Sequence, residues 1–157
     1  MRIGFGFDVH QLVEGLPLTL GGIVIPHHKG AVGHSDADAL IHAICDALLG
    51  AANLGDIGLH FPDSDPALKG IDSKILLQKV ILLITQKGYR VVNIDSTVCL
   101  QQPKLRAYIP QMQEALSMAT SISAENISIK ATTSEKLGFT GREEGVSAYS
   151  SVLLAKE

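Results

Sequence analysis

The sequence predicts an α+β fold, a two-layer single domain over residues 1–157 in which a mixed β-sheet carries helices on one face. Apolar and polar residues alternate over several short segments, which is the period of a strand. Three longer apolar segments are typical of helices. The 157 residues are 46% hydrophobic, which suits one domain with a sizeable core.

The first strand is predicted over residues 1–10, MRIGFGFDVH. Its apolar residues share one face, which we expect to anchor the strand in the core. They are Ile3, Phe5, Phe7 and Val9. The opposite face carries two glycines, which indicate a close approach by another group, and it ends in Asp8 and His10. These two side chains lie roughly 6–7 Å apart along a strand.

The remaining elements follow in order along the chain. They are a hairpin at 18–25 that turns at Gly21-Gly22, helices from about 35 to 50–53, at 72–88 and within 101–122, and strands at 89–100, 126–131 and 145–155. Ser35 and Asp38 resemble a capping box for the first helix, and Gly88 stops the second. Residues 55–70 hold three glycines and two prolines, so we expect a loop without regular structure. Loops of this length are often functional.

Composition excludes several classes of function. Aromatic residues make up 4% of the chain, there is no Trp, and the net charge is −3 without a run of Lys or Arg, so we expect no nucleic-acid partner. Neither a signal peptide nor a membrane span is visible, so no membrane partner is expected. Cys45 and Cys99 are expected to be buried thiols in a reducing compartment. We expect a cytoplasmic (bacterial) protein, or a plastid stroma protein if a transit peptide was removed.

One candidate metal site combines the first strand with the first helix. Asp8 and His10 end the strand, and His42 lies on the helix with Asp38 and Asp46 one turn before and after it. Two imidazoles and a carboxylate are a common catalytic zinc set that leaves the fourth position open. The alternative is that each residue is a surface or capping residue.

Three further groups have both a functional and a structural interpretation. Thr132 and Thr133 suit phosphate oxygens and Glu135 suits Mg²⁺, but Thr132 and Glu135 also match a capping box. The aspartates of residues 55–70 suit a cation or a polyol, or they cap turns. Lys104 and Arg106 suit a phosphate or a base, or they are solvated cations.

Together these motifs resemble one family over essentially the whole chain, the 2-C-methyl-D-erythritol 2,4-cyclodiphosphate synthases. The matching motifs are GFDVH, GHSDADALIHAICDALLGAANLGDIG, FPDSDP, PK and ATTSEKLGFTGR. The resemblance implies a homotrimer with active sites between adjacent subunits. It also implies conversion of the cytidine diphosphate-linked substrate 4-diphosphocytidyl-2-C-methyl-D-erythritol 2-phosphate to a cyclic diphosphate with release of CMP, in non-mevalonate isoprenoid biosynthesis.

The resemblance also implies roles for individual residues. Asp8, His10 and His42 match the ligands of one Zn²⁺ per subunit, and Glu135 matches the carboxylate at Mg²⁺ or Mn²⁺. His34 and Thr133 would stabilise charge on the transferring phosphoryl group, and Asp46 would orient His42. The implied substrate contacts are Ser35, Asp56, Ile57, Gly58, Phe61, Pro62, Asp63, Ser64, Asp65, Leu100, Gln101, Gln102, Pro103, Lys104, Leu105, Arg106, Ala131, Thr132, Ser134, Phe139 and Arg142.

Two other functions fit the same residues. The first is a metal-dependent phosphohydrolase in which bound water attacks, and the second is a non-catalytic trimeric module that binds a ligand or buffers zinc. Tyr149 stands where some family members have an acidic residue, so a ligand of the central trimer cavity is not inferred here. His27, His28 and His60 are expected to be surface histidines without a role.

Overall fold

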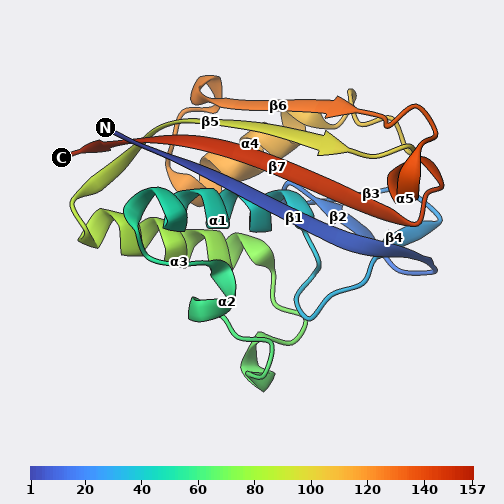
Figure 1. The fold of residues 1–157 in the computed structure, drawn as a ribbon, viewed down its shortest axis with the longest axis horizontal. Coiled ribbons are helices and arrows are strands. Elements are labelled where there is room, and N and C mark those ends of the chain that lie inside the picture. The colour runs from blue at the N-terminus through green and yellow to red at the C-terminus, as the bar shows by residue number, and fades with distance from the viewer.

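The computed structural model describes residues 1–157 as two sheets and a layer of helices (Figure 1). The strands are β1 (Arg2–Glu14), β2 (Leu18–Leu20), β3 (Ile23–Ile25), β4 (Lys29–Ala31), β5 (Tyr89–Cys99), β6 (Ile127–Thr132) and β7 (Gly145–Lys156). Five of them form a sheet in the order β4-β1-β7-β5-β6, and β2 and β3 form a separate hairpin. Only β5 and β6 run parallel, so the predicted mixed sheet and the predicted hairpin are confirmed.

The helices α1 (Ala39–Ala52), α3 (Ser73–Gln86) and α4 (Ile109–Thr120) cover one face of the sheet, as predicted (Figure 1). Nearly all of α1 is buried, because it lies between the sheet and α3. The termini meet at one end of the sheet, where β1 pairs with β7. No helix has the length and apolar character needed to cross a membrane. Cys45 is buried, Cys99 is half-buried, and both are free thiols.

The two faces of β1 are reversed relative to the sequence prediction. Ile3 and Phe5 are 77% and 65% exposed, and they lie on the face of the sheet that no helix covers. The glycine face packs against α1 instead. The approach is so close that a Cβ atom on Gly4 or Gly6 would lie 1.9 or 2.0 Å from a carbonyl oxygen of α1. Periodicity separates the two faces of a strand, but it does not say which face a neighbouring helix covers.

Helix α1 begins later than predicted, because Asp38 and not Ser35 caps it. The buried Asp38 carboxylate accepts hydrogen bonds from the backbone N–H groups of Ile41, Gly21 and Gly22 at 3.0, 2.9 and 2.6 Å. One side chain therefore accepts from backbone N–H groups of both the helix terminus and the turn of the β2–β3 hairpin, which would otherwise lack partners.

The second predicted capping box, at Thr132 and Glu135, is also wrong. No helix begins there, because Glu135 and Lys136 both have positive φ angles, of 54° and 66°. The short helix α5 (Gly138–Gly141) begins after them without a side-chain cap.

Residues 55–70 are more regular than predicted. They contain the single-turn helix α2 (Ile57–His60) and a 3-10 helix (Pro66–Leu68). Asp56 accepts from Leu59 N at 2.9 Å, and Asp65 accepts from Ala67 N at 2.9 Å. Two aspartates of this loop are therefore helix caps. A second short 3-10 helix (Ala124–Asn126) precedes β6.

Candidate metal centre

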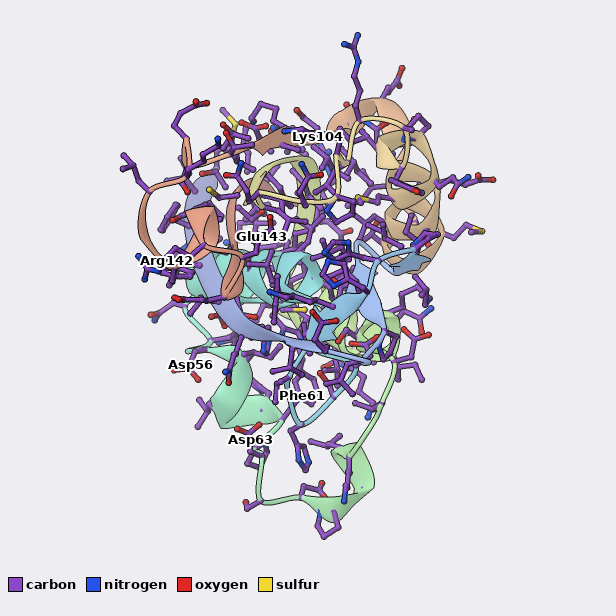
Figure 2. The ribbon with its side chains drawn as sticks, turned by 90° about the vertical axis from the view of Figure 1, so that its right-hand side faces the viewer. Asp56, Phe61, Asp63, Lys104, Arg142 and Glu143 are labelled. Carbon is purple, nitrogen blue, oxygen red and sulfur yellow. The ribbon has the colours of Figure 1, made fainter.

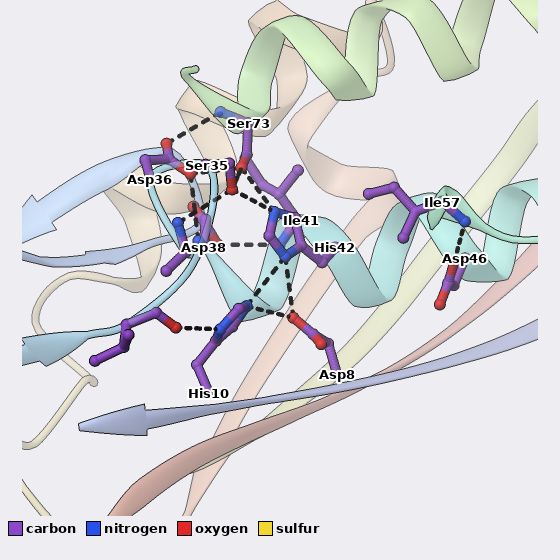
Figure 3. A network of polar contacts seen from close by, with 12 residues as sticks. Asp8, His10, Ser35, Asp36, Asp38, Ile41, His42, Asp46, Ile57 and Ser73 are labelled. Carbon is purple, nitrogen blue, oxygen red and sulfur yellow. Dashed lines mark hydrogen bonds and ion pairs between the residues drawn. The ribbon is translucent and has the colours of Figure 1, made fainter. Parts of the chain in front are cut away.

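Asp8 and His10 of β1 and His42 of α1 converge on one point (Figure 3). The Asp8 Oδ2 atom lies 2.9 Å from His10 Nε2 and 3.0 Å from His42 Nδ1, and the two nitrogens are 3.2 Å apart. The bare glycine face of β1 makes this possible, because it lets α1 approach closely enough for His42 to reach the strand. The predicted combination of two imidazoles and a carboxylate is therefore present in the structure.

The protonation pattern of this triad suits a cation. Burial raises the pKa of Asp8, but hydrogen bonds with His10 and His42 outweigh burial and hold the pKa at about 2. His10 Nδ1 lies 2.8 Å from the carbonyl oxygen of Val32, so this nitrogen carries a proton and donates. Burial lowers the pKa of His10, but the Asp8 carboxylate outweighs burial and raises it, so Nε2 donates to Asp8 until a bound cation displaces this proton. One oxygen and two nitrogens around an open position form a donor set that zinc accepts.

His42 is oriented by Ser73 and Asp36 rather than by Asp46. The Ser73 hydroxyl donates to Asp36 Oδ1, and the Ser73 N–H donates to Asp36 Oδ2 at 3.0 Å. The Ser73 oxygen is therefore free to accept from His42 Nε2, 2.9 Å away, and this contact turns Nδ1 toward the triad. Asp46 instead accepts from Ile57 N at 2.7 Å (Figure 3). Its predicted role is wrong, because its carboxylate holds the start of α2.

The Ser35 hydroxyl is the second neighbour of His42 Nε2, at 3.1 Å. The sequence does not indicate this role for Ser73 or Asp36. Neither has a local signal for it, since Ser73 is 31 residues from His42 and only the packing of α3 beside α1 joins them.

Replacing Ser73 with Ala should weaken binding of the metal by about 10- to 100-fold, because the orienting acceptor for His42 Nε2–H is lost. Competition with a chelating dye measures this affinity. The Asp46→Asn variant is the control, because the amide oxygen can still accept from Ile57 N, and its affinity should match that of the wild type. Equal losses in the two variants would contradict the assignment of Ser73.

A cavity of about 290 Å³ adjoins the triad. Besides the triad, it is lined by six of the residues predicted to contact substrate or phosphate, which are His34, Ser35, Ile57, Gly58, Phe61 and Asp63. His34 Nε2 donates to the carbonyl oxygen of Asp65 at 3.1 Å, which fixes its ring on the cavity wall. Asp56, Pro62, Ser64 and Asp65 do not line this cavity. Of these, Asp56 and Asp65 are the two helix caps.

The other predicted contacts gather around a separate cavity of about 170 Å³. It is lined by Leu100, Pro103, Lys104, Leu105, Arg106, Ala131, Thr132 and Thr133. Glu135 stands beside it, because its Oε1 accepts from the Thr133 hydroxyl at 3.1 Å. Glu135 is not part of the Asp8 cluster. Figure 2 shows Lys104 near one end of the molecule and Asp56 and Asp63 toward the other.

The last predicted contacts line neither cavity. Gln101 Oε1 accepts from Lys136 N at 3.4 Å, and Ser134 Oγ donates to the carbonyl oxygen of Leu137 at 2.7 Å. Gln102 follows Gln101 directly in the chain. Arg142 forms an exposed ion pair with Glu144, with two N–O distances of 3.0 Å. Phe139 packs near Gly145 at the start of β7. One chain therefore brings the predicted residues together in two groups rather than in one site.

The chain resembles proteins of known identity over almost its full length. The model of the YgbB family matches residues 1–155. A 2-C-methyl-D-erythritol 2,4-cyclodiphosphate synthase of Bacteroides thetaiotaomicron is 65% identical over 157 residues, which is 100% of this chain and 99% of that protein.

The chain also resembles solved structures, one of them of a protein with this name. The CDP-bound form of a 2C-methyl-D-erythritol-2,4-cyclodiphosphate synthase is 40% identical, with a TM-score of 0.91 over 98% of this chain and 100% of that one. The bifunctional IspDF from Campylobacter jejuni is 42% identical, with a TM-score of 0.96 over 99% of this chain. This chain spans 42% of that bifunctional protein.

Proposed function

The chain belongs to the YgbB family, and we propose that it is a cyclising phosphorus–oxygen lyase, a 2-C-methyl-D-erythritol 2,4-cyclodiphosphate synthase. It converts 4-diphosphocytidyl-2-C-methyl-D-erythritol 2-phosphate to the 2,4-cyclodiphosphate with release of CMP, a step of isoprenoid precursor biosynthesis. The observation that carries this proposal is the triad of Asp8, His10 and His42 on the wall of a cavity, in a chain that matches the family over residues 1–155.

Two cations fit the residues present. Asp8, His10 and His42 would hold one Zn²⁺ per subunit, because their donor atoms converge and leave a position open. Glu135 would hold Mg²⁺ or Mn²⁺ together with bound substrate, since it is an exposed carboxylate beside the Thr133 hydroxyl. When bound, these cations supply Lewis-acid stabilisation of negative charge on the diphosphate.

The chain itself contributes mainly orientation. In the reaction, an oxygen of the 2-phosphate forms a bond to the β-phosphorus, and the bond from the β-phosphorus to the oxygen of CMP breaks. The nucleophile is already an anion, so no side chain has to remove a proton. Ile57, Gly58, Phe61 and Asp63 would hold the methylerythritol chain so that both groups of one molecule are in line, which supplies several kcal/mol.

Polar side chains in both groups would face the phosphates of the substrate. His34 and Ser35 line the cavity of the triad, and Thr133 lines the second cavity. We assign His34 and Thr133 to stabilising charge on the transferring phosphoryl group, where fixed donors act without reorganising. The backbone and side chains of residues 100–106 and 131–134 would hold the cytidine and its phosphates, with Phe139 and Arg142 as further contacts.

A homotrimer would unite the two groups. Each active site would then combine the triad of one subunit with the second cavity and Glu135 of its neighbour, a heterologous contact that closes into a ring. The uncovered face of the sheet supports this arrangement, because it exposes Ile3, Phe5, Phe7 and Tyr149. Phe7 and Tyr149 form one apolar patch, with ring centroids 5.1 Å apart. Residues 1–157 would form a single cytoplasmic domain.

Turnover in water labelled with ¹⁸O distinguishes cyclisation from hydrolysis. We expect no label in the cyclic product or in CMP, as measured by mass spectrometry, because the attacking oxygen comes from the 2-phosphate. A phosphohydrolase would place one labelled oxygen in a product, since water is then the nucleophile. Incorporation of label would therefore contradict the proposed reaction, and a failure to release CMP would favour a binding module.

A further inference from the structure

A second cluster of metal-ligating side chains, separate from the triad, lies at the C-terminal end of β1. His27 and His28 lie between β3 and β4, and Glu143 lies between α5 and β7. One donor atom from each of these three residues lies within 4.8 Å of the others. The two imidazole centroids are 4.4 Å apart. Figure 2 shows Glu143 between the two groups of predicted substrate contacts.

Backbone contacts hold the two segments of this cluster in place. Gly15 N donates to the carbonyl oxygen of His28 at 3.0 Å, which ties His28 to the end of β1. Lys29 Nζ donates to the carbonyl oxygen of Glu143 at 3.0 Å. Glu143 has a φ angle of 57°, which is uncommon for a residue other than glycine. The cluster is therefore built by the sheet and its turns before any ligand arrives.

The His27 ring has an unsatisfied nitrogen. His27 Nε2 is shielded from solvent and has no hydrogen-bond partner, and no other buried side-chain nitrogen or oxygen is in this state. Such groups are rare in folded proteins, because each one loses its hydrogen bonds to water without replacement. An imidazole nitrogen of this kind is a common metal ligand.

His28 has the partner that a metal-binding imidazole usually has. Its Nδ1 atom lies 3.0 Å from both oxygens of the Glu14 carboxylate. A proton on Nδ1 then points to Glu14 and leaves the Nε2 lone pair available, as in carboxylate–histidine–metal arrangements. The carboxylates of Glu14 and Glu143 together offset the Lys29 ammonium, so the cluster has a net negative charge that favours a cation.

We propose that His27, His28 and Glu143 form a second metal site, which takes a divalent transition cation that prefers imidazole ligands, such as Zn²⁺. Water completes the coordination, because only three protein ligands are present and His28 is exposed. The cation joins the β3–β4 connection to the turn that precedes β7. This site is independent of the triad and of the proposed reaction.

The test measures how many zinc ions each chain binds. Metal-depleted protein is dialysed against micromolar Zn²⁺ and the bound zinc per chain is measured by mass spectrometry. We expect two zinc ions in the wild type and one in each of the variants His27→Asn and Glu143→Gln. Glu144→Gln is the matched control, because it removes the neighbouring carboxylate that lies outside the cluster, and it should keep two.

A crystal grown with zinc locates the second ion by anomalous scattering. We expect a peak about 2.0–2.1 Å from a ring nitrogen of His27 and of His28. Glu143→Gln keeps the test valid if His27→Asn does not fold, because the Glu143 side chain is only half-buried. A single zinc in the wild type, or two zinc ions retained in both cluster variants, would overturn the proposal.

Discussion

Heterotrimers that contain both His42→Ala and Glu135→Gln chains should regain about one-third of wild-type activity, although each variant alone is inactive. Each substitution removes a cation ligand, and several kcal/mol of lost charge stabilisation lowers the rate by about a thousandfold or more. If each site combines the triad of one chain with Glu135 of the next, any ring that contains both variants has one site in three with both halves intact.

The experiment uses co-expression of the two variants with different peptide tags and purification over both tags in series, so that only mixed trimers remain. CMP release is then measured per trimer. The control pairs His42→Ala with Asp8→Asn, because both substitutions damage the same half and no intact site can form in a mixed trimer. Recovery in the control, or none in the first pair, would contradict a site shared between neighbouring chains.

The sequence indicated the positions of the three triad residues, because they lie on elements with clear patterns. Asp8 and His10 are two residues apart and share one face of a strand, and His42 lies on a strongly apolar helix. The long elements were predicted for the same reason, since β1, α1, α3, β5 and β7 all have a strong period or an apolar run. The sequence pattern alone did not decide whether these three residues bind one metal ion, and the family resemblance indicated that they do.

The wrong predictions for the faces of β1 and for Asp46 share a physical cause, because both depend on how elements pack. The exposed side of β1 depends on where α1 lies, and an exposed apolar face has the same alternating pattern as a core face. Asp46 stands one turn from His42, but the side chains that reach His42 Nε2 come from Ser35 and Ser73. The Ser73 contact joins residues 31 positions apart in the chain and has no local signal.

Replacing Gly6 with Ala should destabilise the protein by about 3 kcal/mol or more, because the added Cβ atom would lie 2.0 Å from the carbonyl oxygen of Ala43. Neither atom belongs to a flexible side-chain end, so β1 and α1 have to move apart. Unfolding in urea at a fixed protein concentration measures the loss. The control is Gly50→Ala, also at a glycine, where no atom lies within 4 Å of the added Cβ.

The control variant should be as stable as the wild type or more stable by up to about 1 kcal/mol, because Gly50 is an exposed position within α1 and Ala is the better helix former. Ala43 follows His42 directly, so a shift of α1 at Gly6 also moves His42 away from Asp8 and His10. The Gly6→Ala variant should therefore bind zinc more weakly, even under conditions in which it is fully folded. If it lost stability but kept its zinc affinity, the close packing of β1 on α1 would support the fold without setting the geometry of the triad.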